Sequence, residues 1–333
     1  MKKITALLLA LFVLVGALAG CGKQNDTNKT DKLSIVTTIF PEYDWVREIL
    51  GDKADNAEIT MLLDNGVDLH SYQPTADDIV KISDCDLFIY VGGESDGWVE
   101  DALRNAANRN MKVINLLEIL GDSVKTEEIV EGMQEEYEHE DAHAHDDAEE
   151  HEHEEETDEH VWLSLKNAKM LVRVISKALQ ELDPDNKDIY AANADAYVKK
   201  LSALDADYQA AVDAASNKTI LFGDRFPFRY LVDDYGLRYY AAFVGCSAET
   251  EAGFETISFL AKRVDEWKLP CVLTIEGAQH KIAETIVRNT TTKNQKVLTM
   301  DSMQSITTQD VKNGTTYLSV MEKNLSVLKE ALR

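Results

Sequence analysis

The sequence predicts an α/β protein of two lobes, each a parallel sheet flanked by helices, joined by one long rigid helix. Short apolar runs alternate with helical patterns in the first half of the chain, and the same alternation returns in the second half. Such alternation is typical of parallel sheets with helices on both faces. Between the halves, residues 187–215 carry an apolar stripe at three- and four-residue steps, which predicts a helix of about 40 Å.

Residues 1–20 have the pattern of a lipoprotein signal peptide. Lys2 and Lys3 precede an apolar run that is too short to span a membrane in the mature protein. The run ends in Leu-Ala-Gly-Cys, which resembles the bacterial lipobox. We expect Cys21 to be lipidated, residues 21–32 to form a flexible tether, and the protein to be extracytoplasmic and held to the bacterial cell membrane by its lipid. A plain secretory signal is the alternative.

Residues 33–183 are expected to form the first lobe. The turn residues Asp64-Asn65-Gly66 end one strand, and Thr75 is a predicted helix cap. Expected strands are 33–39, 58–63 and 86–91, and a helix is expected at 165–182. The second lobe is expected at 217–333, with strands at 219–222, 237–243, 271–275 and 296–298 and a last helix at 316–332.

A strongly acidic run interrupts the first lobe. The formal net charge is −26, and 18 acidic residues and no basic ones lie between Glu127 and Glu159. The rest of the chain is only mildly acidic and has no basic stripe, so no nucleic-acid partner is expected. The run has no apolar periodicity, and we interpret residues 125–158 as a disordered loop. Five of its histidines are predicted to be auxiliary metal ligands: His139, His143, His145, His151 and His153.

A zinc-protease motif, H-E-x-x-H, spans residues 139–143. That motif needs a rigid helix that presents both histidines on one face. The neighbouring residues are acidic and offer no apolar stripe to pack such a helix. We therefore interpret the match as a product of composition, and no enzymatic activity is expected.

Five residues of types that can bind metal ions stand beside predicted strands or at the end of the acidic run. His70 comes after the strand at 58–63, and His160 stands where the acidic run meets three apolar residues. Asp224, Glu276 and Asp301 follow strands of the second lobe. Ligands of open α/β sheets bind beyond the carboxyl ends of the strands, and imidazole with carboxylate suits zinc or manganese. These residues are the predicted metal site.

The three remaining cysteines are not part of this prediction. Cys85, Cys246 and Cys271 are far apart in sequence and show no C-x-x-C spacing, so a cysteine-zinc site is not expected. A disulfide between two of them is an alternative for an exported protein.

Three segments resemble the metal-specific solute-binding lipoproteins of zinc and manganese ABC importers. "LLDNGVDLHSYQPTADDIVKISDCDLFIYVGG" resembles the family's first histidine segment and "DEHVWLSLKNAKML" its second. "LTMDSMQSITTQDVKNGTTYLSVMEKNL" resembles its C-terminal segment, and a histidine-rich loop is typical of the zinc-type members. The resemblance covers nearly the whole mature chain and implies that His70, His160 and Asp301 are metal ligands.

One ligand of the family does not carry over directly. The family usually has a histidine or glutamate 11 residues before a helix-ending glycine, and counting back from Gly236 gives Arg225. A guanidinium cannot bind a cation. We therefore expect the neighbouring Asp224 to be the ligand, with Glu276 as a reserve ligand or an outer partner of the site.

The resemblance implies a receptor that captures Zn²⁺ between two lobes and delivers it to the membrane permease of an ABC importer. The long helix implies a modest closure on binding, and a monomer is expected. A Mn²⁺ receptor of the same family, a surface adhesin that contains metal, and a zinc hydrolase are the alternatives. The histidine-rich loop favours zinc, because manganese gains less from imidazole ligands.

Overall fold

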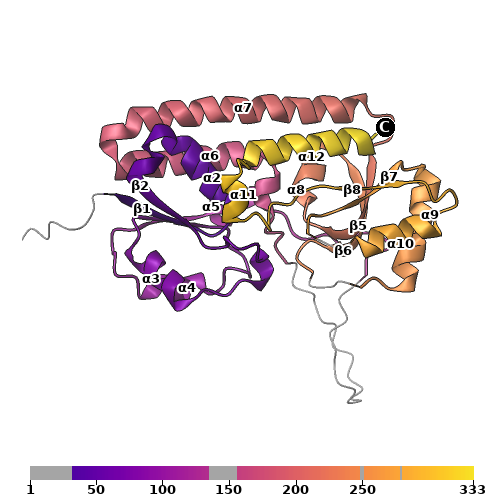
Figure 1. Ribbon diagram of the computed structural model, residues 1–333, viewed down its shortest axis with the longest axis horizontal. Helices are drawn as coiled ribbons and strands as arrows, with labels where there is room; N and C mark the ends of the chain where they lie inside the picture. Colours follow the sequence, from indigo (N-terminus) through magenta and orange to yellow (C-terminus); the bar gives the residue numbers. More distant parts are fainter. Residues whose placement is uncertain (1–31, 135–155, 248–250, 278–279) are drawn as a thin grey trace, which may run out of the picture. The chain divides into compact units, whose positions relative to one another are not determined.

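The computed structural model describes residues 32–134, 156–247, 251–277 and 280–333 (Figure 1). The predicted signal peptide, Cys21, nearly all of the tether, the H-E-x-x-H motif and the five loop histidines lie outside these residues. No helix within the described ranges is long and apolar enough to cross a membrane.

The first lobe is built on a four-stranded parallel sheet of order β2-β1-β3-β4. Three of its strands match predicted apolar runs. The strand β4 was missed because it is only four residues long, shows little alternation of apolar and polar residues, and is mostly only partly buried. Its strands are β1 Leu33–Thr37, β2 Ala57–Met61, β3 Leu87–Tyr90 and β4 Lys112–Asn115, and its helices are α2 Phe40–Leu50, α3 Ala76–Asp84, α4 Val99–Arg104 and α5 Leu116–Leu120. Short 3₁₀ turns lie at η1 Gly51–Asn56, η2 Leu69–Ser71 and η3 Gly121–Ser123.

Two antiparallel helices follow the acidic run. After the 3₁₀ turn η4 (Val161–Leu163), α6 spans Leu165–Leu182, and the turn η5 (Pro184–Asn186) leads into α7, Lys187–Ala214. The predicted stripe of α7 is confirmed, since its members are buried: Tyr197, Leu201, Leu204, Tyr208 and Val212. This helix packs on α2 and α6 at one end and on α8 and α12 toward the other.

The second lobe repeats the strand order of the first, as β6-β5-β7-β8, again all parallel. The two-lobe prediction is therefore confirmed. Its strands are β5 Thr219–Phe226, β6 Arg238–Val244, β7 Cys271–Thr274 and β8 Lys296–Thr299, and its helices are α8 Arg229–Tyr235, α9 Phe254–Trp267, α10 Lys281–Asn289, α11 Thr308–Lys312 and α12 Tyr317–Ala331.

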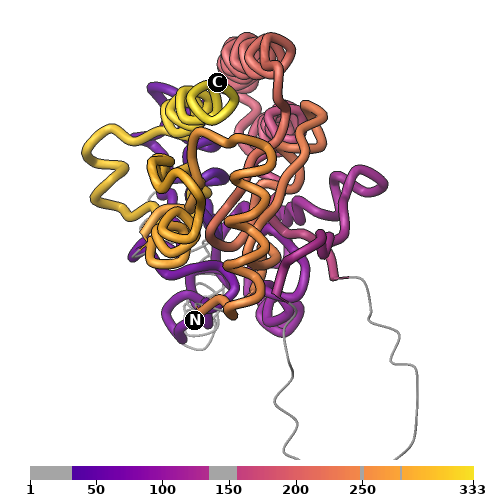
Figure 2. Tube along the Cα trace, turned by 90° about the vertical axis from the view of Figure 1, so that its right-hand side faces the viewer, coloured from indigo at the N-terminus to yellow at the C-terminus, as the bar shows by residue number. Residues whose placement is uncertain are grey.

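The last helix ties the two lobes together. It leaves the second lobe and runs beside α7, as Figures 1 and 2 both show. At its start, the Tyr317 amide donates to Asp44 of α2 (2.9 Å), and the Tyr317 hydroxyl donates to the carbonyl of Trp162 (2.6 Å). One apolar core extends from the first sheet through these helices to β5 and β7. A shared core of this kind resists a large hinge motion.

Both ends of the predicted acidic loop have defined positions. Thr126 pairs with Thr157 in an antiparallel bridge, and the Gln134 amide donates to the carbonyl of Ala242 in β6 (2.9 Å). The acidic run therefore leaves and rejoins the described structure beside the second lobe.

Candidate metal centre

His70 is positioned by a short turn that follows β2. Asp68 caps this turn and accepts a hydrogen bond from the His70 amide (3.1 Å). On the ring, Nδ1 lies 2.9 Å from Oγ of Ser95. The remaining ring nitrogen, Nε2, faces His160.

His160 is fully buried at the start of η4. Oδ1 of Asp158 accepts from both its amide (2.8 Å) and its ring Nδ1 (3.0 Å). Because Nδ1 donates to a carboxylate, Nε2 carries a free lone pair. Trp162, two residues on, donates from Nε1 to the carbonyl of Ser302 (2.8 Å) and fixes this segment against the second lobe.

The two Nε2 atoms lie 3.2 Å apart. Two nitrogens that bind one tetrahedral zinc ion at about 2.0–2.1 Å are about 3.3 Å apart. A polar group on the far ring nitrogen, most often a carboxylate, a backbone carbonyl or water, sets the tautomer and the orientation of a metal-bound histidine. Both histidines have this arrangement, with Ser95 beside His70 and Asp158 beside His160.

Cys246 completes the group from the second lobe. It follows β6, and its amide donates to Oε1 of Glu127 (2.8 Å). Its Sγ and ligand nitrogens of His70 and His160 all lie within 4.8 Å of one another. The sequence analysis missed Cys246, although it stands two residues beyond a strand and the other candidates were found by that same criterion.

The three predicted carboxylates are not in this group. Asp224 was expected just after a strand, but β5 continues to Phe226 and is irregular between Phe222 and Arg225. Asp224 lies in this irregularity, where Oδ1 accepts from the Arg225 amide (2.9 Å). Burial raises its pKa.

The carboxylates of Glu276 and Asp301 accept hydrogen bonds within the loop that follows β8. Glu276 accepts from the amide (2.6 Å) and hydroxyl (2.7 Å) of Ser302 and from the Gln304 amide (3.1 Å). Asp301 accepts from the Met303 amide (2.8 Å). Burial, with the charge of Glu276, raises the pKa of Asp301 to about 6.

The electrostatic environment of the two histidines differs. Burial, together with the charge of His160, lowers the pKa of His70 to about 3. Burial alone would also lower the pKa of His160, but Asp158, Glu127 and Glu159 outweigh it and raise this pKa. Burial and the same three carboxylates raise the pKa of the Cys246 thiol. A bound divalent cation would be stabilised by this negative surrounding field.

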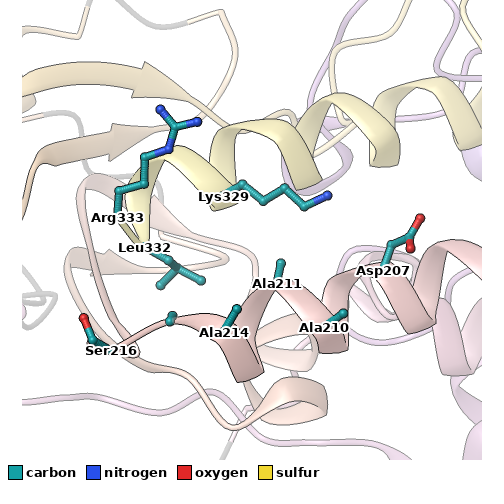
Figure 3. A pocket seen from close by; sticks show the side chains of 9 residues that line it. Asp207, Ala210, Ala211, Ala214, Ser216, Lys329, Leu332 and Arg333 are labelled. Carbon is teal, nitrogen blue, oxygen red and sulfur yellow. The ribbon is translucent and has the colours of Figure 1, made fainter.

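An open cleft of about 880 Å³ adjoins the group on the side of the second lobe. Its walls include Asp68, Asp224, Arg225, Glu276 and His280. A second hollow of about 520 Å³ lies between the ends of α7 and α12, and none of the predicted ligands lines it (Figure 3).

Comparison with known proteins identifies the family of the chain. The profile of the family described as "Zinc-uptake complex component A periplasmic" matches residues 35–331. The chain belongs to this family.

The relatives that the chain matches are named for zinc binding or zinc uptake. The zinc-binding lipoprotein AdcA of Streptococcus pneumoniae is 33% identical over 99% of the chain, which spans 61% of that relative's length. The high-affinity zinc uptake system protein ZnuA of Bacillus subtilis is 31% identical over 97% of the chain and 95% of its own length. The Zn(II)-bound ZnuA-like domain of S. pneumoniae AdcA superposes with a TM-score of 0.68 at 29% identity, covering 90% of this chain and 99% of that one.

Proposed function

We propose that this protein is the extracytoplasmic receptor of an ABC importer and that it captures Zn²⁺ between its two lobes for delivery to the membrane permease. The pair of facing Nε2 atoms carries this proposal, because its spacing fits one tetrahedral ion and each ring is oriented from its far nitrogen. The names of the zinc-binding relatives support the same cargo. Lipid attachment at Cys21 would keep the receptor beside its permease.

The function is one of capture and release, without turnover. His160 is fully buried and His70 has a side chain 14% exposed, so an ion enters past His70. Zinc prefers such imidazole donors more strongly than manganese does.

A chelator-competition titration with Zn²⁺ and Mn²⁺ tests the proposal. We expect one tight zinc ion per chain and much weaker manganese binding. His70→Ala and His160→Ala should each weaken zinc binding by more than the roughly 10–100-fold that loss of an outer partner costs. His280→Ala is the matched control, since His280 lies in the cleft wall and outside the ligand group. Tight zinc binding that survives both ligand substitutions would overturn the proposal.

A further inference from the structure

We propose that Cys246 binds the transported ion directly, which makes the primary site one of two imidazoles and one thiolate. The inference rests on the proposed function, that His70 and His160 bind zinc, and adds the donor that the second lobe contributes. It was not expected from the spacing of the cysteines.

Geometry singles out this thiol. Cys85, Cys246 and Cys271 are all free, but Cys85, which follows α3, and Cys271, in β7, are both buried in the apolar core. Sγ of Cys246 is within 4.8 Å of nitrogens on both histidines. Sulfur and nitrogen bound to one tetrahedral zinc at about 2.3 and 2.0–2.1 Å lie about 3.6 Å apart. A small movement of Cys246 therefore suffices for coordination.

The segment that carries Cys246 is held against both histidines. Gly245 lies so close to His160 that a Cβ there would be 3.0 Å from Cε1 of the ring. Arg225 donates to the carbonyl of Ser247 (3.3 Å) and to Oδ2 of Asp68 (2.8 Å), the residue that caps the His70 turn. The residues on either side of Cys246 are thus tied to the two histidine segments.

Coordination replaces the S–H bond of Cys246 by an S–Zn bond and releases the proton to solvent. Thiolate is a soft ligand that selects zinc and disfavours manganese, whose preferred donors are oxygen atoms. A thiolate from the second lobe would therefore set the choice of metal and close the site around the ion.

Cobalt(II) substitution tests the inference in the full chain. Cobalt takes the zinc position, and a cobalt–thiolate bond gives an intense near-ultraviolet charge-transfer band that nitrogen and oxygen ligands do not give. We expect this band in the wild-type protein and in the matched control Cys271→Ala, and its loss in Cys246→Ala. Zinc affinity should fall at least about 100-fold in Cys246→Ala, while selectivity against manganese decreases.

The outcomes separate this inference from the proposed function. A wild-type protein that binds no tight zinc refutes the proposed function itself. One tight zinc ion with no charge-transfer band, or with unchanged affinity in Cys246→Ala, overturns only the thiolate ligand. Cys246→Ser guards against a folding defect, because it keeps the size of the side chain and should also lose the band.

Discussion

At the scale of single residues, the sequence predicted the histidines and missed the thiol. His70 and His160 were proposed because each stands beside a predicted element and because their segments resemble the two histidine segments of the family. Asp158, which orients His160, was counted only as part of an acidic run. Cys246 was passed over because the expected signal was a short cysteine spacing, whereas the fold supplies its partners from distant segments.

A buried carboxyl group near the start of α2 makes stability depend on pH. Oε2 of Glu42 accepts from the amide (2.8 Å) and hydroxyl of Thr38 and from the Ile39 amide, and the group is fully buried. Burial, reinforced by Asp96, raises its pKa from 4.5 to about 8. Between these values the folded state keeps a proton that the unfolded state releases, so the free energy of unfolding falls as pH rises.

Glu42→Gln should remove this contribution, because glutamine accepts the same hydrogen bonds and does not ionise. The free energy of unfolding of the variant, relative to wild type, should increase from pH 5 to pH 8 by at most about 1.4 kcal/mol per pH unit. Denaturant unfolding at pH 5, 6, 7 and 8 measures it. A difference that stays constant over this range would show that Glu42 does not titrate there.

At the scale of elements, long amphipathic segments were predictable and local irregularities were not. The bounds of α6 match the prediction and those of α7 end one residue earlier, because their apolar periods persist over several turns. The irregularity in β5 shifts Asp224 into the strand and directs the Arg225 side chain to Asp68. Register shifts of this kind depend on tertiary packing, so the assignment of Asp224 as a ligand is not supported by the structure.

The ion pair between Arg225 and Asp68 links β5 to the His70 turn across the lobes. We expect Arg225→Ala and Asp68→Asn each to weaken zinc binding by about 10-fold, because either change frees the turn that orients His70. The double variant should bind zinc no more weakly than Arg225→Ala alone, because Arg225→Ala already removes the ion pair that Asp68→Asn removes. Additive losses in a zinc titration would argue against it. Arg288→Ala is the control, because the Arg288 side chain is exposed on α10, and it should leave zinc binding unchanged.

At the scale of the whole molecule, the lobes share strand order and a common core, and the proposed ligands come from both. Such an arrangement permits small movements of loops around a fixed frame. The sequence predicted this architecture from alternation and one long helix. It did not predict how the last helix joins the lobes, because Tyr317 finds its partners Asp44 and Trp162 only in the folded chain.

The acidic run, residues 125–158, is expected to collect zinc through its histidines without forming the primary site. It has few apolar residues to fix a geometry, so each of its sites must be ordered on binding and should be weak. Its negative charge should concentrate divalent cations near the cleft. Removing its histidines should therefore lower the number of weakly bound ions and leave the tight ion in place.

The most direct test is a calorimetric zinc titration of a chain in which His139, His143, His145, His151 and His153 are replaced by asparagine. Asparagine keeps the length and polarity of the run. Our account predicts one tightly bound zinc ion with nearly unchanged affinity, fewer weak sites, and loss of the tight ion when His160→Ala is added. Loss of tight binding while His70 and His160 are intact would show that the run supplies the primary ligands and would contradict a site between the lobes.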